Sequence, residues 1–272
     1  MSNKAVDYLN SSSESICNGE TQQRESEVDM DGIINLCKPK GISSFKALSI
    51  VKARLAKELG IPSRRLKVGH LGTLDPAACG VLILLIGRAC KLNQQLSADK
   101  KIYRSVFTFG VTSPTLDSET EVTATSDVIP LRKQIEAVLP SMLGEIEIEV
   151  PKFSAVHING ERAYDLARKG IDFTPPKKVV KIDRFELLQD TKHLDLHRQE
   201  PLGEHEFYFE IECQTGTYIR SLAKLLAEKL GTLAIASTII RTRVGEFDIE
   251  DAKNLDSIVT SDIIEMQGEY EG

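Results

Sequence analysis

Residues 68–87, with the sequence VGHLGTLDPAACGVLILLIG, constrain this chain more than any other stretch. The glycines let the backbone turn tightly and approach a ligand closely, because they carry no Cβ atom. One carboxylate, Asp75, follows them, and Pro76 fixes the chain direction directly after it. The apolar run 81–86 is short and partly β-branched, which is typical of a buried strand. The pattern indicates a carboxylate on a stiff loop that enters the core, suited either to catalysis or to capping a turn.

Composition places the chain among ordinary globular proteins. Its 272 residues are 41% hydrophobic and 27% charged, enough for one large or two small domains. No apolar stretch approaches the roughly 18 residues that a membrane span requires. The N-terminus lacks the basic segment and apolar core of a secretory signal, so we expect a cytoplasmic protein. Five cysteines without C-x-x-C spacing favour reduced thiols over a disulfide framework or a zinc site.

The net charge of −6 is unevenly distributed along the chain. Residues 1–30 are acidic and rich in Ser, Glu and Gln, so we expect a disordered N-terminal extension. Residues 38–104 contain many more Lys and Arg than Asp and Glu. A cationic surface around Asp75 is what a phosphate backbone would bind, although a solvated helix surface would account for 46–57 equally well.

The apolar patterns predict a mixture of strands and helices. Strands are predicted over 32–37, 81–86, 102–111, 145–150, 179–188, 206–214 and 233–244. Helices are predicted from Ser43 or Ser44 to Leu59 and over 88–96, 131–143 and 218–230. The sequence has no internal repeats and no clear linker after residue 30. We therefore expect a single α+β domain.

The Asp75 stretch resembles the motif G-H-T-G-x-L-D-P-x-A-x-G-x-L of the TruB family of tRNA pseudouridine synthases. Further ordered blocks are similar to that family, namely residues 35–44, 101–104, 151–170, 216–222 and 240–245. The resemblance covers about residues 32–255. It implies the pseudouridine synthase fold, with a mixed, mostly antiparallel sheet flanked by helices. It also implies a catalytic domain over 31–250, with an RNA-binding thumb at about 151–176. The tail 251–272 is too short for a full PUA domain.

The resemblance also implies the catalytic residues. Asp75 corresponds to the family's catalytic carboxylate, acting as a nucleophile or as a base toward the ribose, and both routes remain open. Arg220 is its expected partner, because a guanidinium can hold a carboxylate through two parallel hydrogen bonds. Tyr103 is expected to stack on the extruded base and to take part in proton transfer at C5. The chemistry requires neither a metal nor a cofactor.

Residues expected to bind the substrate follow from the same blocks. His70 is expected to enter the space that the flipped base leaves, because chemistry on an enclosed base requires its extrusion. Tyr218 is assigned to the pocket, and Ile240 to its apolar wall. The remaining candidates lie in the opening segment and in the thumb, namely Lys38, Pro39, Ser154, Ala155 and Arg168.

Two positions depart from the family pattern. Leu71 stands where Thr is usual, and His157 stands where Lys often follows Ser-Ala, so the thumb loses a permanent charge. His193 and His197 have helical ligand spacing, but no third ligand is evident and the residues around them suggest a surface hairpin.

The sequence thus predicts a monomeric enzyme without a membrane partner that binds the T-arm of tRNA. Its expected reaction is the isomerisation of uridine to pseudouridine at position 55. A synthase for another T-loop-like RNA is one alternative, and an RNA-binding folding factor with dispensable catalysis is another. The guide-RNA-dependent relatives generally carry the terminal RNA-binding domain that we expect to be missing here. Guide-RNA-dependent modification is therefore the less favoured interpretation.

Overall fold

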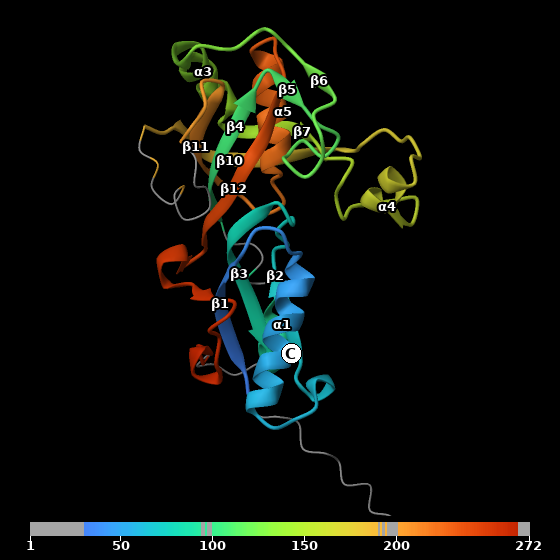
Figure 1. The fold of residues 1–272 in the computed structure, drawn as a ribbon, viewed down its shortest axis with the longest axis vertical. Coiled ribbons are helices and arrows are strands. Elements are labelled where there is room, and N and C mark those ends of the chain that lie inside the picture. Colours follow the sequence, from blue (N-terminus) through green and yellow to red (C-terminus); the bar gives the residue numbers. More distant parts are fainter. Residues whose placement is uncertain are drawn as a thin grey trace, which may run out of the picture.

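The computed structural model of the chain describes residues 30–93, 96, 100–189, 191, 194 and 201–265. These residues form an elongated α+β body around one sheet (Figure 1). The ten strands of this sheet are β1 (Gly32–Lys38), β2 (Val68–Leu71), β3 (Ala78–Ile86), β4 (Lys101–Phe109), β7 (Gly144–Glu149), β10 (Lys177–Leu187), β11 (Glu206–Cys213), β12 (Ala234–Val244), β13 (Phe247–Asp248) and β14 (Lys253–Asn254).

The helices and minor strands complete the fold. The α-helices are α1 (Ser44–Glu58), α3 (Arg132–Val138), α4 (Ala163–Arg168) and α5 (Ile219–Lys229). The 3₁₀ helices are η1 (Ser63–Arg65), η2 (Gly87–Leu92), η3 (Leu139–Met142), η4 (Ile249–Asp251) and η5 (Thr260–Asp262). Two short hairpins are formed by β5 (Val111–Thr112) with β6 (Ala124–Thr125), and by β8 (His157–Ile158) with β9 (Glu161–Arg162).

The sheet is mixed and mostly antiparallel, as predicted. Its order is β14-β1-β3-β12-β4-β11-β10-β7, and the pairs β1–β14 and β3–β12 are parallel. The β3–β12 junction joins the part of the sheet next to α1 to the part next to α5 (Figure 1). At this junction a Cβ atom on Gly80 would lie 2.3 Å from the carbonyl oxygen of Arg241. Glycine is required there, because its φ of +98° also disfavours any other residue.

Helix α1 follows from its sequence. Ser43 caps it, because its side-chain oxygen accepts a hydrogen bond from the Lys46 N–H. Buried apolar residues at helical spacing, among them Ala47, Val51 and Leu55, pack into the apolar cluster on one face of the sheet. The helix therefore stands at a fixed position beside the loop that carries Asp75.

Each face of the sheet carries its own apolar cluster. Leu82 and Leu84 of β3 face the cluster that includes the buried residues of α1 and α5. Val81 and Ile83 face a smaller cluster on the other side. Every residue of β3 is buried, which confirms the predicted buried strand.

Two predicted helices contain 3₁₀ segments. The helix predicted over 131–143 is α3 followed by the 3₁₀ helix η3, in which Pro140 provides no N–H for an α-helical hydrogen bond. The helix predicted over 88–96 begins as the 3₁₀ helix η2; Asn93 and Leu96 are also helical, and residues 94 and 95 lie outside the described residues.

The residues after 250 belong to the folded body. Strand β14 pairs with β1, and Ile264 exchanges backbone hydrogen bonds with Ile33. Leu255 and Ile258 are buried in the core. The predicted domain boundary at residue 250 is therefore too early, because the chain returns to cover the edge of β1.

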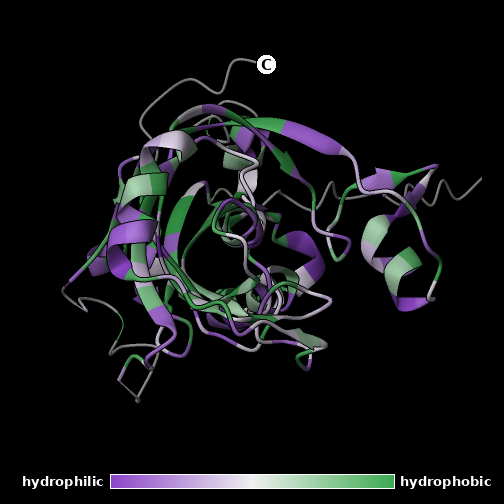
Figure 2. Ribbon diagram, turned by 90° about the horizontal axis from the view of Figure 1, so that it is seen from above, coloured by the Kyte–Doolittle hydropathy of each residue, from purple (hydrophilic) through white to green (hydrophobic). Residues whose placement is uncertain are grey.

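The segment 151–176 projects from the body. It carries the β8–β9 hairpin and α4, and it stands apart when the molecule is viewed from above (Figure 2). Hydrogen bonds within the segment stabilise it, including Tyr164 N–H to Ser154 O at 3.0 Å and Ala163 N–H to Val156 O at 2.7 Å. We refer to 151–176 as the thumb segment.

None of the helices formed by the described residues has both the length and the apolar character that a membrane crossing needs. Cys37, Cys79, Cys90 and Cys213 are free thiols.

Candidate active site

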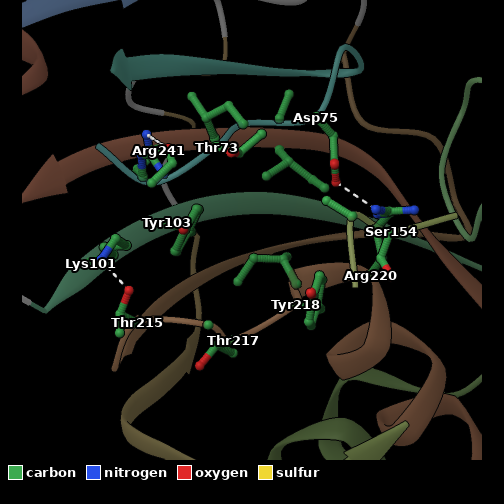
Figure 3. A pocket seen from close by; sticks show the side chains of 17 residues that line it. Thr73, Asp75, Lys101, Tyr103, Ser154, Thr215, Thr217, Tyr218, Arg220 and Arg241 are labelled. Carbon is green, nitrogen blue, oxygen red and sulfur yellow. Dashed lines mark hydrogen bonds and ion pairs between the residues drawn. The ribbon is translucent and has the colours of Figure 1, made fainter. Parts of the chain in front are cut away.

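A cavity of about 290 Å³ opens beside the β3–β12 junction. Three of the predicted catalytic residues, Asp75, Tyr103 and Arg220, line it together with Tyr218 (Figure 3). They come from the loop before β3, from β4 and from the start of α5. Residues separated by up to 145 positions in the chain therefore meet around one cavity, whose volume is near the lower end of small-molecule sites.

The loop that carries Asp75 is fastened to the N-terminus of α1. The Leu74 N–H donates to Ser44 Oγ at 2.8 Å, and the Ser44 hydroxyl donates to the Leu74 carbonyl at 2.9 Å. The Gly41 N–H donates to the Pro76 carbonyl at 2.8 Å. Because both sides of Asp75 are held, its carboxylate has a defined position at the mouth of the cavity, where 37% of its side chain remains exposed.

Arg220 reaches Asp75 from the first turn of α5. Its Nη2 lies 2.7 Å from Asp75 Oδ2, and only 3% of its side chain is exposed. The guanidinium also donates to the carbonyls of Thr115 at 2.8 Å and Phe153 at 3.0 Å. A guanidinium held at several points presents a fixed donor to the carboxylate, which lysine could not reproduce.

Sequence reasoning did not identify Asp117, which lies behind Arg220. Its side chain is fully buried, and its Oδ2 is 3.7 Å from Arg220 Nε. The Thr115 hydroxyl and the Glu119 N–H donate to its Oδ1 at 2.5 and 2.9 Å. Arg220 thus lies between two carboxylates, one buried and one at the cavity. The loop position of Asp117 in a polar stretch gave no signal that would single it out.

Both tyrosines of the cavity are protonated at neutral pH. Burial raises the pKa of Tyr103, and the nearby Arg241 guanidinium opposes the rise. Burial also raises the pKa of Tyr218, and the Asp75 carboxylate adds to that rise. Each phenol can therefore donate a hydrogen bond, and Tyr103 presents an aromatic side chain to whatever occupies the cavity.

The cavity is also lined by two cations that were not predicted as site residues, Lys101 and Arg241. Lys101 and Arg241 are 3% and 1% exposed. Lys101 Nζ donates to Thr215 Oγ1 at 2.9 Å, and Arg241 donates to the carbonyls of Val81 at 2.7 Å and Gly72 at 2.8 Å. Both residues stand in the quoted motif blocks, and the alternation of β4 places Lys101 on the same side as Tyr103.

A second, larger hollow of about 680 Å³ adjoins the cavity, and Asp75 and Arg220 line both. We call this hollow the groove. Its walls are the start of α1, His70 of β2 and the thumb segment, which contributes Ser154, Ala155, His157, Arg162, Tyr164 and Arg168. Arg162 and Arg168 lie 5.9 and 5.4 Å from the ring centroid of Tyr164. The groove therefore combines cations with aromatic surface, which suits single-stranded nucleic acid.

His70 lines the groove as a neutral imidazole. Burial lowers its pKa, and Arg241 lowers it further. Its Nδ1 is buried and has no hydrogen-bond partner among the described residues. A neutral ring with an unused polar atom is suited to contact a base edge.

The structure corrects the prediction for Ile240. That side chain belongs to the apolar cluster on the far face of the sheet, and its neighbour Ile239 lines the cavity. Successive residues of a strand point to opposite faces, so an error of one position exchanges the two sides.

Lys38 and Pro39 do not line the cavity or the groove. Lys38 is fully buried, and its Nζ donates to the carbonyls of Pro39 at 3.0 Å and Ile42 at 2.7 Å. Burial lowers the pKa of Lys38 to about 8, while Cys79 and Asp75 oppose the shift. This lysine stabilises the turn before α1, so the expected contact with substrate is not supported.

Of the cationic residues of 38–104 that were predicted to surround Asp75, Lys101 lines the cavity. Among the described residues, no lysine or arginine of that stretch lines the groove, whose arginines are Arg162, Arg168 and Arg220. Arg88 instead pairs with Asp31.

Within the part of the chain that the structure describes, no three His, Cys, Asp or Glu side chains are grouped so that they could hold a metal ion. His193 and His197 lie outside the described residues.

Comparisons with known proteins agree with this geometry. Residues 59–219 match the model of the N-terminal domain of the TruB family pseudouridylate synthases. The tRNA pseudouridine synthase B of Bacillus cereus is 37% identical over 232 residues, which cover 84% of this chain and 71% of that protein. The enzyme of the same name from a Caulobacter species is 38% identical over 231 residues, covering 84% and 68%.

Solved structures show the same fold. A chain of a Cbf5–Nop10–Gar1 complex superposes with a TM-score of 0.57 at 27% identity, over 83% of this chain and 52% of that chain. A chain of an H/ACA ribonucleoprotein bound to a substrate RNA containing 2′-deoxyuridine has a TM-score of 0.55 at 25% identity, over 83% and 51%. This chain thus spans about half the length of those solved chains. On the family model and the identity to the bacterial enzymes, it belongs to the TruB family of pseudouridylate synthases.

Proposed function

We propose that this protein isomerises uridine to pseudouridine at position 55, in the T-loop of tRNA. The observation that carries the proposal is the Asp75–Arg220 ion pair at the junction of the groove and the cavity. The names of its bacterial relatives, tRNA pseudouridine synthase B, support tRNA as the substrate.

The two hollows suggest how the substrate binds. The groove receives the RNA strand between α1 and the thumb segment, where Arg162, Arg168 and His70 meet it. The target base leaves its stack and enters the cavity, so its ribose remains at the mouth beside Asp75. Tyr103 supplies the stacking surface, which contributes roughly 1–3 kcal/mol.

The reaction then proceeds at the ribose. Asp75 either attacks C1′ or removes a proton from the sugar, and the N1–C1′ bond breaks with its electron pair on the base. The base turns and forms the C5–C1′ bond, which breaks the bond between Asp75 and C1′ in the first route and is accompanied by return of the proton from Asp75 to the sugar in the second. The C5 proton leaves, with the Tyr103 phenol placed to take part in its transfer, and N1 gains a proton. Arg220 keeps Asp75 ionised and oriented, because a neighbouring cation favours the carboxylate form.

The test compares the wild-type protein with Asp75→Asn on tRNA transcripts. Mass spectrometry of T-loop fragments after chemical labelling of pseudouridine would report the modified position. We expect modification of position 55 by the wild type and none by Asp75→Asn. The exposed Asp256 provides the matched control, because Asp256→Asn makes the same chemical change away from the cavity.

Three outcomes would contradict the proposal. Equal modification by wild type and Asp75→Asn would remove Asp75 from the chemistry. Modification of other RNAs but not of the T-loop, seen by pseudouridine mapping in cells lacking the protein, would favour the other T-loop-like substrates. Rescue of those cells by Asp75→Asn would favour a folding factor.

A further inference from the structure

One large apolar side chain of α1 lies outside the core. Phe45, in the first turn of this helix, is 72% exposed. The buried stripe of the helix is formed by other residues, among them Ala47, Val51 and Leu55. Single exposed apolar residues are common on protein surfaces, so the surroundings of Phe45 decide whether it has a role.

Phe45 lines the groove that Asp75 also lines. The rings of Phe153 and Tyr164 line it as well, but both of these residues are half-buried, whereas Phe45 is exposed. Two guanidinium groups already lie near the Tyr164 ring. Phe45 therefore offers the most accessible of these three rings to a molecule bound in the groove.

The backbone that carries this ring is held in place. Ser44, directly before Phe45, is buried and exchanges hydrogen bonds with the backbone of Leu74 at 2.8 and 2.9 Å. The Ser49 hydroxyl donates to the Phe45 carbonyl at 2.8 Å. Because Leu74 directly precedes Asp75, the same contacts fix the backbone of the ring and that of the carboxylate. A ring on a fixed backbone loses less conformational freedom when it binds a partner.

We propose that Phe45 stacks on a second unpaired base of the substrate RNA, outside the cavity that receives the target uridine. The inference deepens the proposed function and rests on it, since it concerns the same RNA in the same groove. The occupant is RNA, because Arg162 and Arg168 of the thumb segment line this groove and can contact phosphates. Glu119 also lines the groove, and its carboxylate can accept hydrogen bonds from base N–H groups. Cations together with an accessible ring form the combination that binds a single strand.

Stacking on Phe45 would support the extrusion of the target base. When that base leaves its stack, the neighbouring base loses the partner on one of its faces. The Phe45 ring provides a replacement, and every base can use it because every base has a π-face. The ring therefore stabilises the opened RNA without reading its sequence.

The first experiment measures the dissociation constant of a T-arm RNA by fluorescence anisotropy. All proteins carry Asp75→Asn, so that the RNA stays unmodified. We expect Phe45→Ala to raise the dissociation constant about 5–100-fold, as the loss of one stacked base does. Phe45→Tyr keeps the ring and should stay within about twofold, whereas Phe45→Leu lacks a π-face and should resemble Phe45→Ala. Leu131→Ala is the matched control, because Leu131 is 70% exposed and lines neither the cavity nor the groove.

A second experiment tests whether the partner of the ring is a base. Each unpaired nucleotide of the loop other than the target is replaced in turn by an abasic nucleotide. At one position we expect the abasic RNA to bind the protein with Phe45 at least about fivefold more weakly than the intact RNA does. The protein with Phe45→Ala should bind both RNAs equally, because the contact is already lost.

The outcomes separate this inference from the proposed function. An unchanged dissociation constant with Phe45→Ala, full affinity with Phe45→Leu, or equal losses from the abasic nucleotides in both proteins would overturn the inference while activity on the T-loop stands. If Phe45→Ala changed self-association and left RNA affinity unchanged, the ring would belong to a contact between copies of the chain. Failure of the wild type to modify an RNA that it binds through Phe45 would instead overturn the proposed function.

Discussion

Arg220 bonds to the Asp75 carboxylate at 2.7 Å although the two residues lie on different elements, a loop before β3 and the first turn of α5. The relation is maintained from both sides, because Ser44 holds the loop and Asp117 lies behind the guanidinium. Four separate parts of the chain therefore determine the position of one carboxylate.

Arg220→Lys should abolish most of the activity without weakening RNA binding. Lysine keeps the charge but cannot donate at once to Asp75, Thr115 O and Phe153 O. We expect the single-turnover rate to fall about 10²–10³-fold. The matched control is Arg243→Lys, because Arg243 pairs with Asp248 away from the cavity. A rate within threefold of wild type would show that the three simultaneous contacts of Arg220 are unnecessary.

Asp117→Asn should lower both stability and rate. The carboxylate is fully buried beside Arg220, and removing one member of a buried charged pair costs about 3–5 kcal/mol. Urea denaturation would measure the free energy of unfolding. In a double-mutant cycle with Arg220→Lys, we expect a rate coupling of about 0.5–3 kcal/mol. Strictly additive effects would mean that Asp117 does not act through Arg220.

Alanine substitutions at Ile239 and Ile240 should separate activity from stability. Both side chains are buried, so each change should lower the free energy of unfolding by about 2–5 kcal/mol. Only Ile239→Ala changes the wall of the cavity, and it alone should lower the rate in fully folded protein. A larger loss of activity from Ile240→Ala would contradict the strand register described above.

His70 should make the protein less stable at acid pH. Burial lowers its pKa below the ordinary 6.5, so the unfolded chain binds the proton first as the pH falls. The free energy of unfolding should therefore decrease below pH 6.5, and the difference between wild type and His70→Gln should show this slope. Urea titrations from about pH 8 to about pH 5 would measure it. Parallel curves for the two proteins would contradict the prediction.

Lys38→Met should affect folding and leave RNA binding unchanged. The two carbonyls that Lys38 bonds would lose their donor, which costs about 1–3 kcal/mol each where they remain unsatisfied. Because the pKa of Lys38 is lowered from 10.5 to about 8, its contribution to stability should rise with pH between these values. The variant should lack this rise. If folded Lys38→Met bound RNA tenfold more weakly than the wild type, the result would contradict this prediction and indicate that Lys38 contacts the RNA.

Local sequence patterns were sufficient for much of the fold. The cap at Ser43, the apolar spacing of α1 and the continuous apolar run of β3 each encode an element through nearest neighbours along the chain. The order of such elements indicated a mixed sheet. Asp75 was identifiable because a carboxylate between glycines, a proline and a buried strand is a local feature.

Other features depend on residues far apart in the chain, and no local pattern contains them. Asp117 belongs to the site because its Oδ2 lies 3.7 Å from Arg220 Nε, a contact between distant parts of the chain. The Lys38 side chain lies inside the protein, where its Nζ donates to two carbonyl oxygens. The parallel junction of β3 and β12 decided that Ile239, not Ile240, faces the cavity. The sequence determined the elements and singled out the Asp75 carboxylate, because these follow from short-range spacing. The tertiary structure decided which buried charges meet it, since burial and distance exist only after the strands have paired.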